Sequence, residues 1–198
     1  ERECTVQRRR QKLAELAPAP GLDPALRERL IGAALALARR ARYRGLGTFE
    51  FLVDRDAEDP ETAIAFIEAN ARIQVEHTVT EAVTGLDLVA LQLRIAGGAR
   101  LADLGLEAPP ATPRGHALQL RLNAEAMDAA GGLRPASGVL SAFEAPTGPG
   151  VRVDAAGHAG MAANPRYDPL LAKLIVHHPS GDWGACVDRA YRAMCEFR

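Results

Sequence analysis

The sequence predicts an α+β fold, and three observations support this. Apolar residues recur at helical spacing over about 20 residues after Asp23, which indicates a helix near the start of the chain. Two segments of strand character, 48–53 and 63–70, follow that helix. The remainder is rich in short strand patterns and ends in a helical pattern over 182–197.

The first helix has clear start and stop signals. Asp23 can accept hydrogen bonds from the free N–H groups of the first turn, and Pro24 has no N–H to lose, so the helix begins there. Three arginines within 39–42 lie where the negative end of the helix dipole favours cations, and Gly45 allows the helix to stop. The apolar face consists of Leu26, Leu30, Ala33, Ala34 and Leu37.

The two strand segments, Thr48 to Val53 and Ala63 to Asn70, predict a β-hairpin. The polar stretch between them, 54–61, contains Pro60 and has the composition of a turn. A second helix is predicted over 85–96, because its apolar residues share a face and two glycines follow it.

The second half of the chain predicts a separate β-rich domain. Residues 101–114 include three prolines and form a predicted linker between a domain at 1–100 and a domain at 115–198. The closing helix can cover a sheet of that second domain. Its strand patterns lie at 116–123, 139–145, 151–153 and 171–178.

The composition is that of a globular chain, with 198 residues, 47% of them hydrophobic and 25% charged. A formal charge of −1 argues against nucleic acid or an anionic membrane as a partner, because both attract basic surfaces. No apolar stretch approaches the roughly 20 residues that a bilayer helix needs. Cys4, Cys186 and Cys195 form no C-x-x-C pair, so we expect the cytoplasm, with the mitochondrial matrix as an alternative. Because the first residue is Glu1 rather than Met, we expect a piece of a longer protein.

A polar row stands out between positions 66 and 77, where every second residue is charged or carries an amide. Side chains alternate in an extended chain, so the row would share one face and its apolar neighbours the other. At about 3.3 Å per residue the row would extend roughly 26 Å, so it must serve successive sites or bend. Its members are Glu68, Asn70, Arg72, Gln74 and Glu76.

Hairpin pairing is expected to bring Glu50 close to Glu68 and Asn70. Two converging carboxylates repel each other unless a cation offsets their charge, and carboxylate and amide oxygens are ligands that Mg²⁺ prefers. The residues therefore predict a metal–nucleotide site. The alternative is that both carboxylates face solvent on an exposed hairpin.

The motifs GTFEFL at 47–52 and EANARIQVEHTVTE at 68–81 identify a family. With five shorter motifs in the same order, the chain resembles biotin carboxylase over nearly its whole length. The shorter motifs are QRRRQK at 7–12, APAPG at 17–21, GHA at 115–117, RLNAE at 121–125 and YDPLLAKL at 167–174.

The resemblance implies the C-terminal part of an ATP-grasp domain over 1–100, and a small β-rich biotin carboxylase C-terminal domain over 115–198. It implies ATP- and bicarbonate-dependent carboxylation of biotin through carboxyphosphate, within an acyl-CoA, pyruvate or urea carboxylase. No Gly-rich phosphate loop occurs in the sequence. The N-terminal part of biotin carboxylase is therefore expected elsewhere, and the chain alone is expected to be inactive.

The resemblance also assigns the nucleotide and metal residues. Glu50, Glu68 and Asn70 would hold Mg²⁺ or Mn²⁺ between the ATP phosphates. The ATP-binding residues would be Gln7, Arg10, Glu50, Leu52 and Glu68. Family members commonly have His at the position of Arg10 and Pro at that of Ala71, so the chain departs from the pattern there.

For the chemistry, the resemblance implies that Arg72, Gln74 and Val75 form the bicarbonate pocket, with Lys12 adding a second positive charge. Glu76 would be the general base. Arg121 would stabilise charge on biotin, oriented by Asp168.

Several partners follow from the resemblance: a biotin carboxyl carrier domain, a carboxyltransferase domain or subunit, and a second copy of the chain in a possible homodimer. Two other interpretations remain open. One is another ATP-grasp ligase, such as a carbamoyl-phosphate synthase, and the other is a non-catalytic assembly module.

Overall fold

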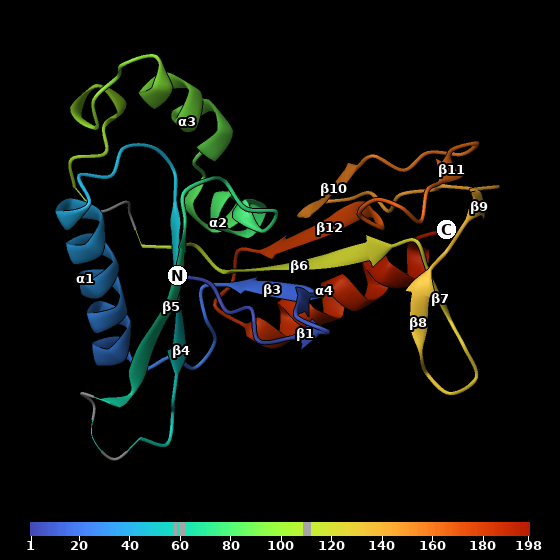
Figure 1. Cartoon of the computed structure of the whole chain (residues 1–198), viewed down its shortest axis with the longest axis horizontal. Coiled ribbons are helices and arrows are strands. Elements are labelled where there is room, and N and C mark those ends of the chain that lie inside the picture. The colour runs from blue at the N-terminus through green and yellow to red at the C-terminus, as the bar shows by residue number, and fades with distance from the viewer. Residues whose placement is uncertain (58, 60–61, 109–111) are drawn as a thin grey trace.

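The computed structural model describes residues 1–57, 59, 62–108 and 112–198. It has two parts, a helical part around the β4–β5 hairpin and a sheet covered by α4 (Figure 1). The helices are α1 (Pro24–Arg40), α2 (His77–Thr84), α3 (Leu88–Ala96), the 3-10 turn η2 (Ala102–Leu104) and α4 (Trp183–Glu196). The early strands are β1 (Gln7–Arg8), β2 (Gln11–Lys12), β3 (Ala14–Ala17), β4 (Thr48–Val53) and β5 (Ile64–Asn70). The later strands are β6 (His116–Asn123), β7 (Glu125–Met127), β8 (Leu133–Pro135), β9 (Gly138–Val139), β10 (Val151–Ala155), β11 (Ala162–Ala163) and β12 (Leu170–His178).

A four-stranded antiparallel sheet, in the order β10-β12-β6-β3, forms the centre of the structure. Its edge strand β3 comes from the start of the chain and pairs with β6, Glu15 lying opposite Gln119. Residues 14–17 thus belong to the same sheet as the predicted second domain. The predicted division into 1–100, 101–114 and 115–198 stays a prediction.

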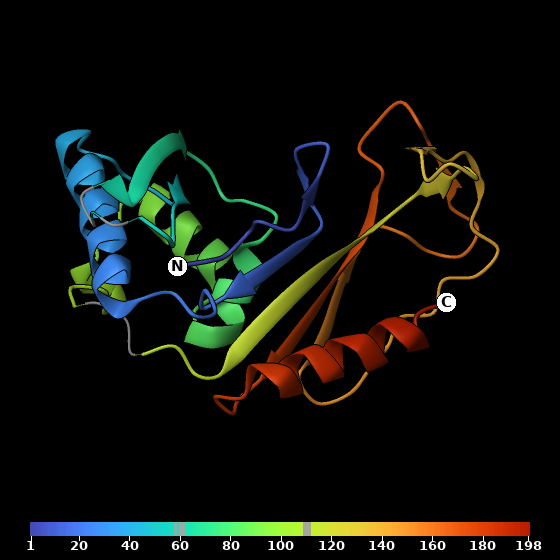
Figure 2. The same ribbon diagram turned by 90° about the horizontal axis from the view of Figure 1, so that it is seen from below.

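The two faces of this sheet carry different side chains. Leu118, Leu174 and Val176 point to one face, where they pack against Cys186 and Ala190 of α4. Figure 2 shows α4 lying along this side of the strands. The opposite face packs against α2 through a second apolar cluster, which consists of Ala17, Val79, Val83, Ala117 and Ile175.

The strand alternation places polar residues on the α2 face. Glu15, between Ala14 and Leu16 of the α4 cluster, points to the α2 side, as do Gln119, Arg121 and Lys173 on their own strands. Of these, Glu15 and Gln119 are fully buried. Burying polar groups is costly unless they are hydrogen-bonded, so this face is where a polar network must form.

The β4–β5 hairpin confirms the predicted pairing. Glu50 lies opposite Glu68 and Thr48 opposite Asn70, with a bulge after Glu50 that shifts the register. The part of the predicted turn that includes Pro60 lies outside the described residues.

The first helix begins as predicted, because the Asp23 carboxylate accepts a hydrogen bond from the Leu26 amide at 3.0 Å. It ends at Arg40, earlier than the predicted stop at Gly45. Arg42 adopts the left-handed conformation, with a φ of 48°, and the Tyr43 amide then bonds back to the Ala38 carbonyl. This cap needs no glycine.

The middle of the chain decides one open alternative and corrects one prediction. Of the two possibilities for the polar row, successive sites along an extended chain or a bend, the structure has the bend, because β5 ends at Asn70 and α2 begins at His77. The helix predicted over 85–96 starts at Leu88, since Gly85, with a φ of 73°, ends α2 and Asp87 caps α3.

The second half differs from its predicted pattern in its short strands. Of the strand expected over 139–145, only Val139 lies in a strand, β9 (Gly138–Val139), and residues 140–145 are loop. The patterns also missed β3, whose four residues all lie in the core and so show no polar alternation. The short pairs β1–β2 and β7–β8, and β11, were missed as well, being only two or three residues long.

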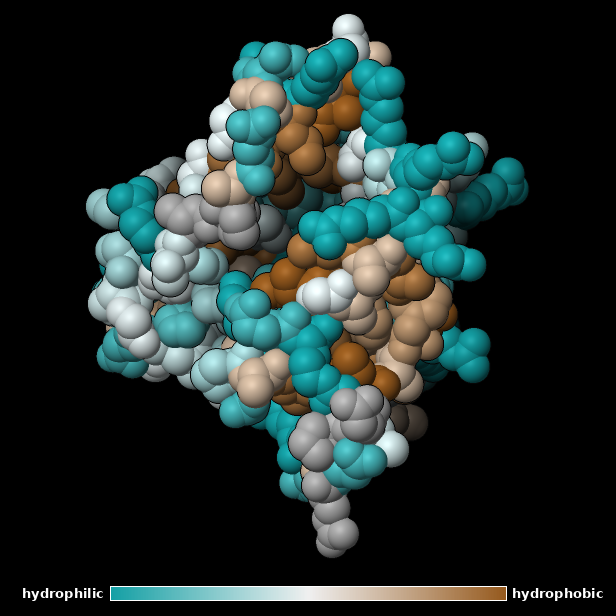
Figure 3. All heavy atoms as spheres, turned by 90° about the vertical axis from the view of Figure 1, so that its left-hand side faces the viewer, coloured by the Kyte–Doolittle hydropathy of each residue, from teal (hydrophilic) through white to brown (hydrophobic). Residues whose placement is uncertain are grey.

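One side of the structure leaves apolar side chains open to solvent, over α1, α3 and the β4–β5 hairpin (Figure 3). Helix α1 buries none of its residues. Apolar side chains left open to solvent on several neighbouring elements are typical of a contact face. The exposed apolar residues on these elements include Leu35, Leu37, Leu52, Phe66, Ile67, Val89 and Leu93. In the described ranges, no helix has both the length and the apolar character to cross a bilayer.

Leu174 offers a test of the sheet core. Its side chain is fully buried in the α4 cluster, so Leu174→Ala is expected to lower the free energy of unfolding by about 2–5 kcal/mol. Leu101→Ala, at a residue 54% exposed, is the matched control. Urea denaturation of both variants measures the difference, and equal midpoints would contradict this description of the core.

Candidate active site

The candidate site lies where the hairpin, β2, the bend over 71–76 and the α2 face of the sheet meet. Its central residue is Glu76, which sits at the N-terminus of α2 with only 2% of its surface exposed. The N-terminal end of a helix dipole favours a carboxylate. We refer to Lys12, Glu15, Glu50, Glu76 and Arg121 as the charged cluster.

Two cations hold Glu76. The Lys12 ammonium lies 2.6 Å from one carboxylate oxygen, and the Arg121 guanidinium donates to the other at 3.2 Å. Each oxygen of this buried carboxylate therefore has its own charged donor, as a buried charge requires.

The pKa values of this pair move in opposite directions. Burial alone raises the pKa of Glu76, but the hydrogen bond and charge of Lys12 outweigh it, so the net pKa lies below the usual value. Burial alone lowers the pKa of Lys12, and the bonds to Glu76 and Glu50 reverse this to a net rise. Both groups are therefore charged at neutral pH.

Glu50 joins the cluster to the hairpin. One of its oxygens accepts from Lys12 at 3.1 Å, from Gln74 at 2.7 Å and from Asn70 at 3.1 Å. The Asn70 amide also donates to Glu68 at 2.7 Å, so it bridges the two carboxylates that the sequence predicted would converge.

This arrangement fits a hard cation. Two carboxylates face each other on paired residues, and the positive end of the Asn70 amide lies between them, where a divalent ion would offset the same repulsion. In the described ranges, no group of three or more His, Cys, Asp or Glu side chains forms a metal site. A cation here would depend on Glu50, Glu68 and the oxygen of Asn70.

The predicted bicarbonate residues lie in the bend after β5. Arg72 is exposed, and its guanidinium is held by the Ile73 carbonyl at 3.2 Å and the Asn70 amide oxygen at 3.4 Å. The Val75 carbonyl accepts from Lys173 at 3.1 Å. Gln74 is buried and donates to Glu50.

The prediction that Asp168 orients Arg121 is wrong. Asp168 accepts from the Leu170 amide at 3.0 Å, whereas the Arg121 Nε donates to Glu15 at 2.6 Å. The reason lies in the sheet, because β3 pairs with β6 and places Glu15 on the same face as Arg121.

The side chains of the other predicted ATP residues make no hydrogen bond or ion pair with the charged cluster in the part of the chain that the structure describes. Gln7 donates to the Cys4 carbonyl at 2.9 Å, and Arg10 sits in the β1–β2 turn with a φ of 65°. Leu52 is 65% exposed on β4. The backbone of Gln7 pairs with that of Lys12 in the β1–β2 ladder, but among the described residues no side-chain hydrogen bond or ion pair joins Gln7 or Arg10 to the cluster.

Two site residues were not predicted from the sequence, Arg2 and Glu15. Arg2 donates to Gln74 at 2.6 Å and to Thr48 and Thr80, both at 3.2 Å, which ties the bend to β4 and α2. Neither residue belongs to the polar row. For Glu15 the signal was a single carboxylate inside an apolar run, which indicates a buried charge with a partner.

Two family models match the chain. Residues 1–104 match the model described as "Carbamoyl-phosphate synthase L chain, ATP binding domain", which alone does not separate the predicted family from its carbamoyl-phosphate synthase alternative. Residues 119–198 match "Biotin carboxylase C-terminal domain". The chain belongs to the biotin carboxylase family. The predicted resemblance and fold class are confirmed.

Relatives and solved structures agree with this family. The chain is 46% identical to a biotin carboxylase of Nostoc, over 99% of the chain and 41% of that protein. It is 43% identical to human mitochondrial pyruvate carboxylase, over 100% of the chain and 16% of that protein. A single-chain, multi-domain long-chain acyl-CoA carboxylase superposes with a TM-score of 0.93 at 48% identity, covering all of this chain and 21% of the other.

A solved biotin carboxylase domain also contains ligands. The 2-oxoglutarate carboxylase domain of Hydrogenobacter thermophilus, a dimer described with MgADP and bicarbonate, matches with a TM-score of 0.86 and 38% identity. All of this chain and 41% of that one are covered. The chain therefore spans well under half the length of these biotin carboxylase relatives.

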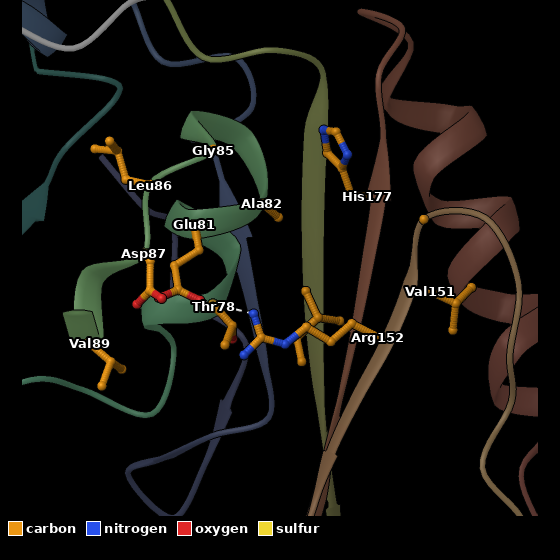
Figure 4. A pocket seen from close by; sticks show the side chains of 12 residues that line it. Thr78, Glu81, Ala82, Gly85, Leu86, Asp87, Val89, Val151, Arg152 and His177 are labelled. Atoms are coloured by element: carbon orange, nitrogen blue, oxygen red, sulfur yellow. Dashed lines mark hydrogen bonds and ion pairs between the residues drawn. The ribbon is translucent and has the colours of Figure 1, made fainter. Parts of the chain in front are cut away.

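A cavity of about 600 Å³ lies beside the cluster rather than in it, between α2, the loop before α3, and strands β10 and β12. Figure 4 shows Arg152 reaching across it from β10 toward Glu81 of α2, which it contacts at 2.9 Å. Thr78 lines the cavity and is the point where the cavity adjoins the polar network.

Cys4 gives a test of burial beside the cluster. Burial raises the pKa of its thiol to about 11, with Glu76 and Glu15 adding to the rise and Lys12 opposing it. Since only the thiolate reacts, alkylation by iodoacetamide at pH 8 is expected to be about 100-fold slower than for an exposed cysteine with the ordinary thiol pKa of 9.0. Peptide mapping of the native and the urea-unfolded protein compares the two rates, and equal rates would contradict the burial.

Proposed function

We propose that the chain is part of a longer biotin-dependent carboxylase and supplies residues for the ATP- and bicarbonate-dependent carboxylation of biotin. The observation that supports this most directly is a buried carboxylate, Glu76, held between two cations on different elements. A base next to fixed positive charges suits a reaction in which an anion must be bound, deprotonated and turned into a nucleophile.

Bicarbonate would bind to Arg72, Gln74 and Val75, with Lys12 as the second positive group. Arg72 is exposed next to the cluster, and its planar fork suits a planar oxyanion. Lys12 keeps its charge at neutral pH because its pKa is raised by its carboxylate partners, despite the opposing effect of burial.

Glu76 would act as the general base. Its lowered pKa, which the Lys12 pair produces against the effect of burial, keeps it ionised and ready to accept the bicarbonate proton at neutral pH. The deprotonated anion would attack the terminal phosphorus of ATP and displace ADP to give carboxyphosphate, which would break down to CO₂ and phosphate beside biotin. The released phosphate would accept the ureido N–H proton of biotin, the resulting enolate would capture the CO₂ carbon, and Arg121 would stabilise the charge on the biotin oxygen.

Glu50, Glu68 and Asn70 would hold Mg²⁺ or Mn²⁺. The cation would offset negative charge on the ATP phosphates. The convergence of Glu50, Glu68 and Asn70 supports this metal assignment. ATP itself would contact Gln7, Arg10, Glu50, Leu52 and Glu68, together with residues from the N-terminal part of the biotin carboxylase, which would cover the exposed apolar face of Figure 3.

The partners in this proposal are a biotin carboxyl carrier domain and a carboxyltransferase domain or subunit, with a second copy in a homodimer. The supporting neighbours are a single-chain, multi-domain long-chain acyl-CoA carboxylase and a dimeric biotin carboxylase domain. The proposed location is the cytoplasm, and the human relative named as mitochondrial makes the matrix the alternative.

The function and the role of Glu76 can be tested together in the full-length protein. ATP hydrolysis is expected to need bicarbonate and to rise with free biotin, and Glu76→Gln is expected to reduce turnover about 10²- to 10⁴-fold through loss of the base. Phosphate release measures turnover, and MgATP binding serves as the control. If biotin has no effect, another ATP-grasp ligase becomes the better interpretation, and unchanged turnover in the variant excludes the base assignment.

The metal assignment has its own test. Glu68→Gln keeps the shape of the side chain but removes one of the two charges, so the Mg²⁺ concentration for half-maximal ATP hydrolysis is expected to rise about tenfold or more. Glu125→Gln, which changes a carboxylate paired with Arg8 outside the site, is the control. A wild-type Mg²⁺ titration curve for Glu68→Gln would contradict a metal between β4 and β5.

A further inference from the structure

Glu15 is a fully buried carboxylate that the proposed reaction does not use. It lies on β3 with 0% exposure and points to the α2 face of the sheet. One of its oxygens accepts from the Arg121 Nε at 2.6 Å, and the terminal nitrogen of the same guanidinium lies 2.5 Å away. The other oxygen accepts from the Gln119 amide at 2.8 Å.

The hydrogen bonds of Glu15 belong to a closed ring. Gln119 accepts from the Thr78 hydroxyl through its amide oxygen, and Thr78 lies on α2, two residues after Glu76. Glu76 in turn accepts from Arg121 at 3.2 Å. The ring thus runs from Glu76 through Arg121, Glu15, Gln119 and Thr78 and returns to Glu76 along the first turn of α2.

The ring fixes the direction of each hydrogen bond. Because the Thr78 hydroxyl donates to the Gln119 oxygen, the Gln119 nitrogen must face Glu15 and donate to it. Both oxygens of Glu15 then accept, which is the role of an ionised carboxylate. Burial raises the pKa of Glu15 overall, although Arg121 and Gln119 oppose that rise, so its charge is maintained by these two donors.

We propose that Glu15 is a positioning residue for Arg121, and that the ring holds Arg121 and Glu76 in one fixed geometry. This inference rests on the proposed function, in which Arg121 stabilises charge on biotin. Nε and one terminal nitrogen of the guanidinium contact the same Glu15 oxygen, and that terminal nitrogen also donates to Glu76, so two carboxylates hold Arg121 where Glu76 alone would make a single contact. The remaining donors of Arg121 are then oriented for a planar acceptor such as the biotin ureido oxygen.

A purely structural role for Glu15 predicts a different behaviour. Buried ion pairs contribute little net stability, because the cost of removing both charges from water offsets their attraction. Glu15→Gln removes the charge that burial opposes and keeps nearly the same volume, so the fold is expected to survive. What the variant loses is the charged contact to Arg121.

A double-mutant cycle in the full-length protein tests the inference. Glu15→Gln is expected to lower kcat/KM for free biotin at least about tenfold, the equivalent of one charge-assisted hydrogen bond, while the KM for MgATP stays within about twofold. Arg121→Ala is expected to lower kcat/KM for biotin further. In the Arg121→Ala background, Glu15→Gln is expected to have no additional effect, because the residue it acts through is gone.

The outcomes separate the inference from the proposed function. If Arg121→Ala leaves biotin use unchanged, the proposed role of Arg121 fails and the inference fails with it. If Arg121→Ala impairs biotin use but Glu15→Gln does not, the function stands and the inference is wrong. An additive loss in the double variant would assign Glu15 a general structural role instead.

Two further variants keep the test decisive. Glu125→Gln removes a carboxylate from another arginine, Arg8, outside the ring, and it is expected to leave kcat/KM for biotin unchanged. Should Glu15→Gln fail to fold, Thr78→Val breaks the ring at its far end and frees the Gln119 amide to turn. It is expected to impair biotin use in the same direction with an unchanged KM for MgATP, and wild-type kinetics would overturn the inference.

Discussion

The rest of the site depends on the burial of one carboxylate, Glu76, between Lys12 and Arg121. A charge in a low-dielectric interior is tolerated only with partners that are held in place, and both partners come from distant parts of the chain. Lys12 lies on β2 and Arg121 on β6, while Glu76 itself begins α2. The placement of three elements is thereby tied to a single pair of oxygens.

The sheet makes this placement possible through simple alternation. On β6 and β12, residues pointing one way form the apolar core with α4, and residues pointing the other way carry the polar groups. A slip of one residue in register would exchange the two sets and bury Arg121 under α4. The packing of the apolar face of the sheet against α4 therefore determines the geometry of the polar face, although α4 lies on the opposite side of the sheet.

Much of this was readable from the sequence, and the limits have physical causes. The hairpin pairing of Glu50 with Glu68 followed from local alternation, the start of α1 followed from the cap at Asp23, and α4 followed from its helical spacing, all of which are local signals. The bend after Asn70 was left open as one of two possibilities, because alternation in sequence does not by itself decide between an extended and a bent chain. Glu15 was missed because its partner in space lies 104 positions away, at Gln119.

The strand β3 has a consequence for how such a chain is made. Its sheet neighbour β6 is synthesised about a hundred residues later. Residues 14–17 therefore have no hydrogen-bonding partner from β6 during that part of synthesis. Closing so long a loop is slow, and during that interval a carboxylate destined for the interior, Glu15, stays hydrated. The native sheet, and with it the polar ring, therefore needs both ends of the chain.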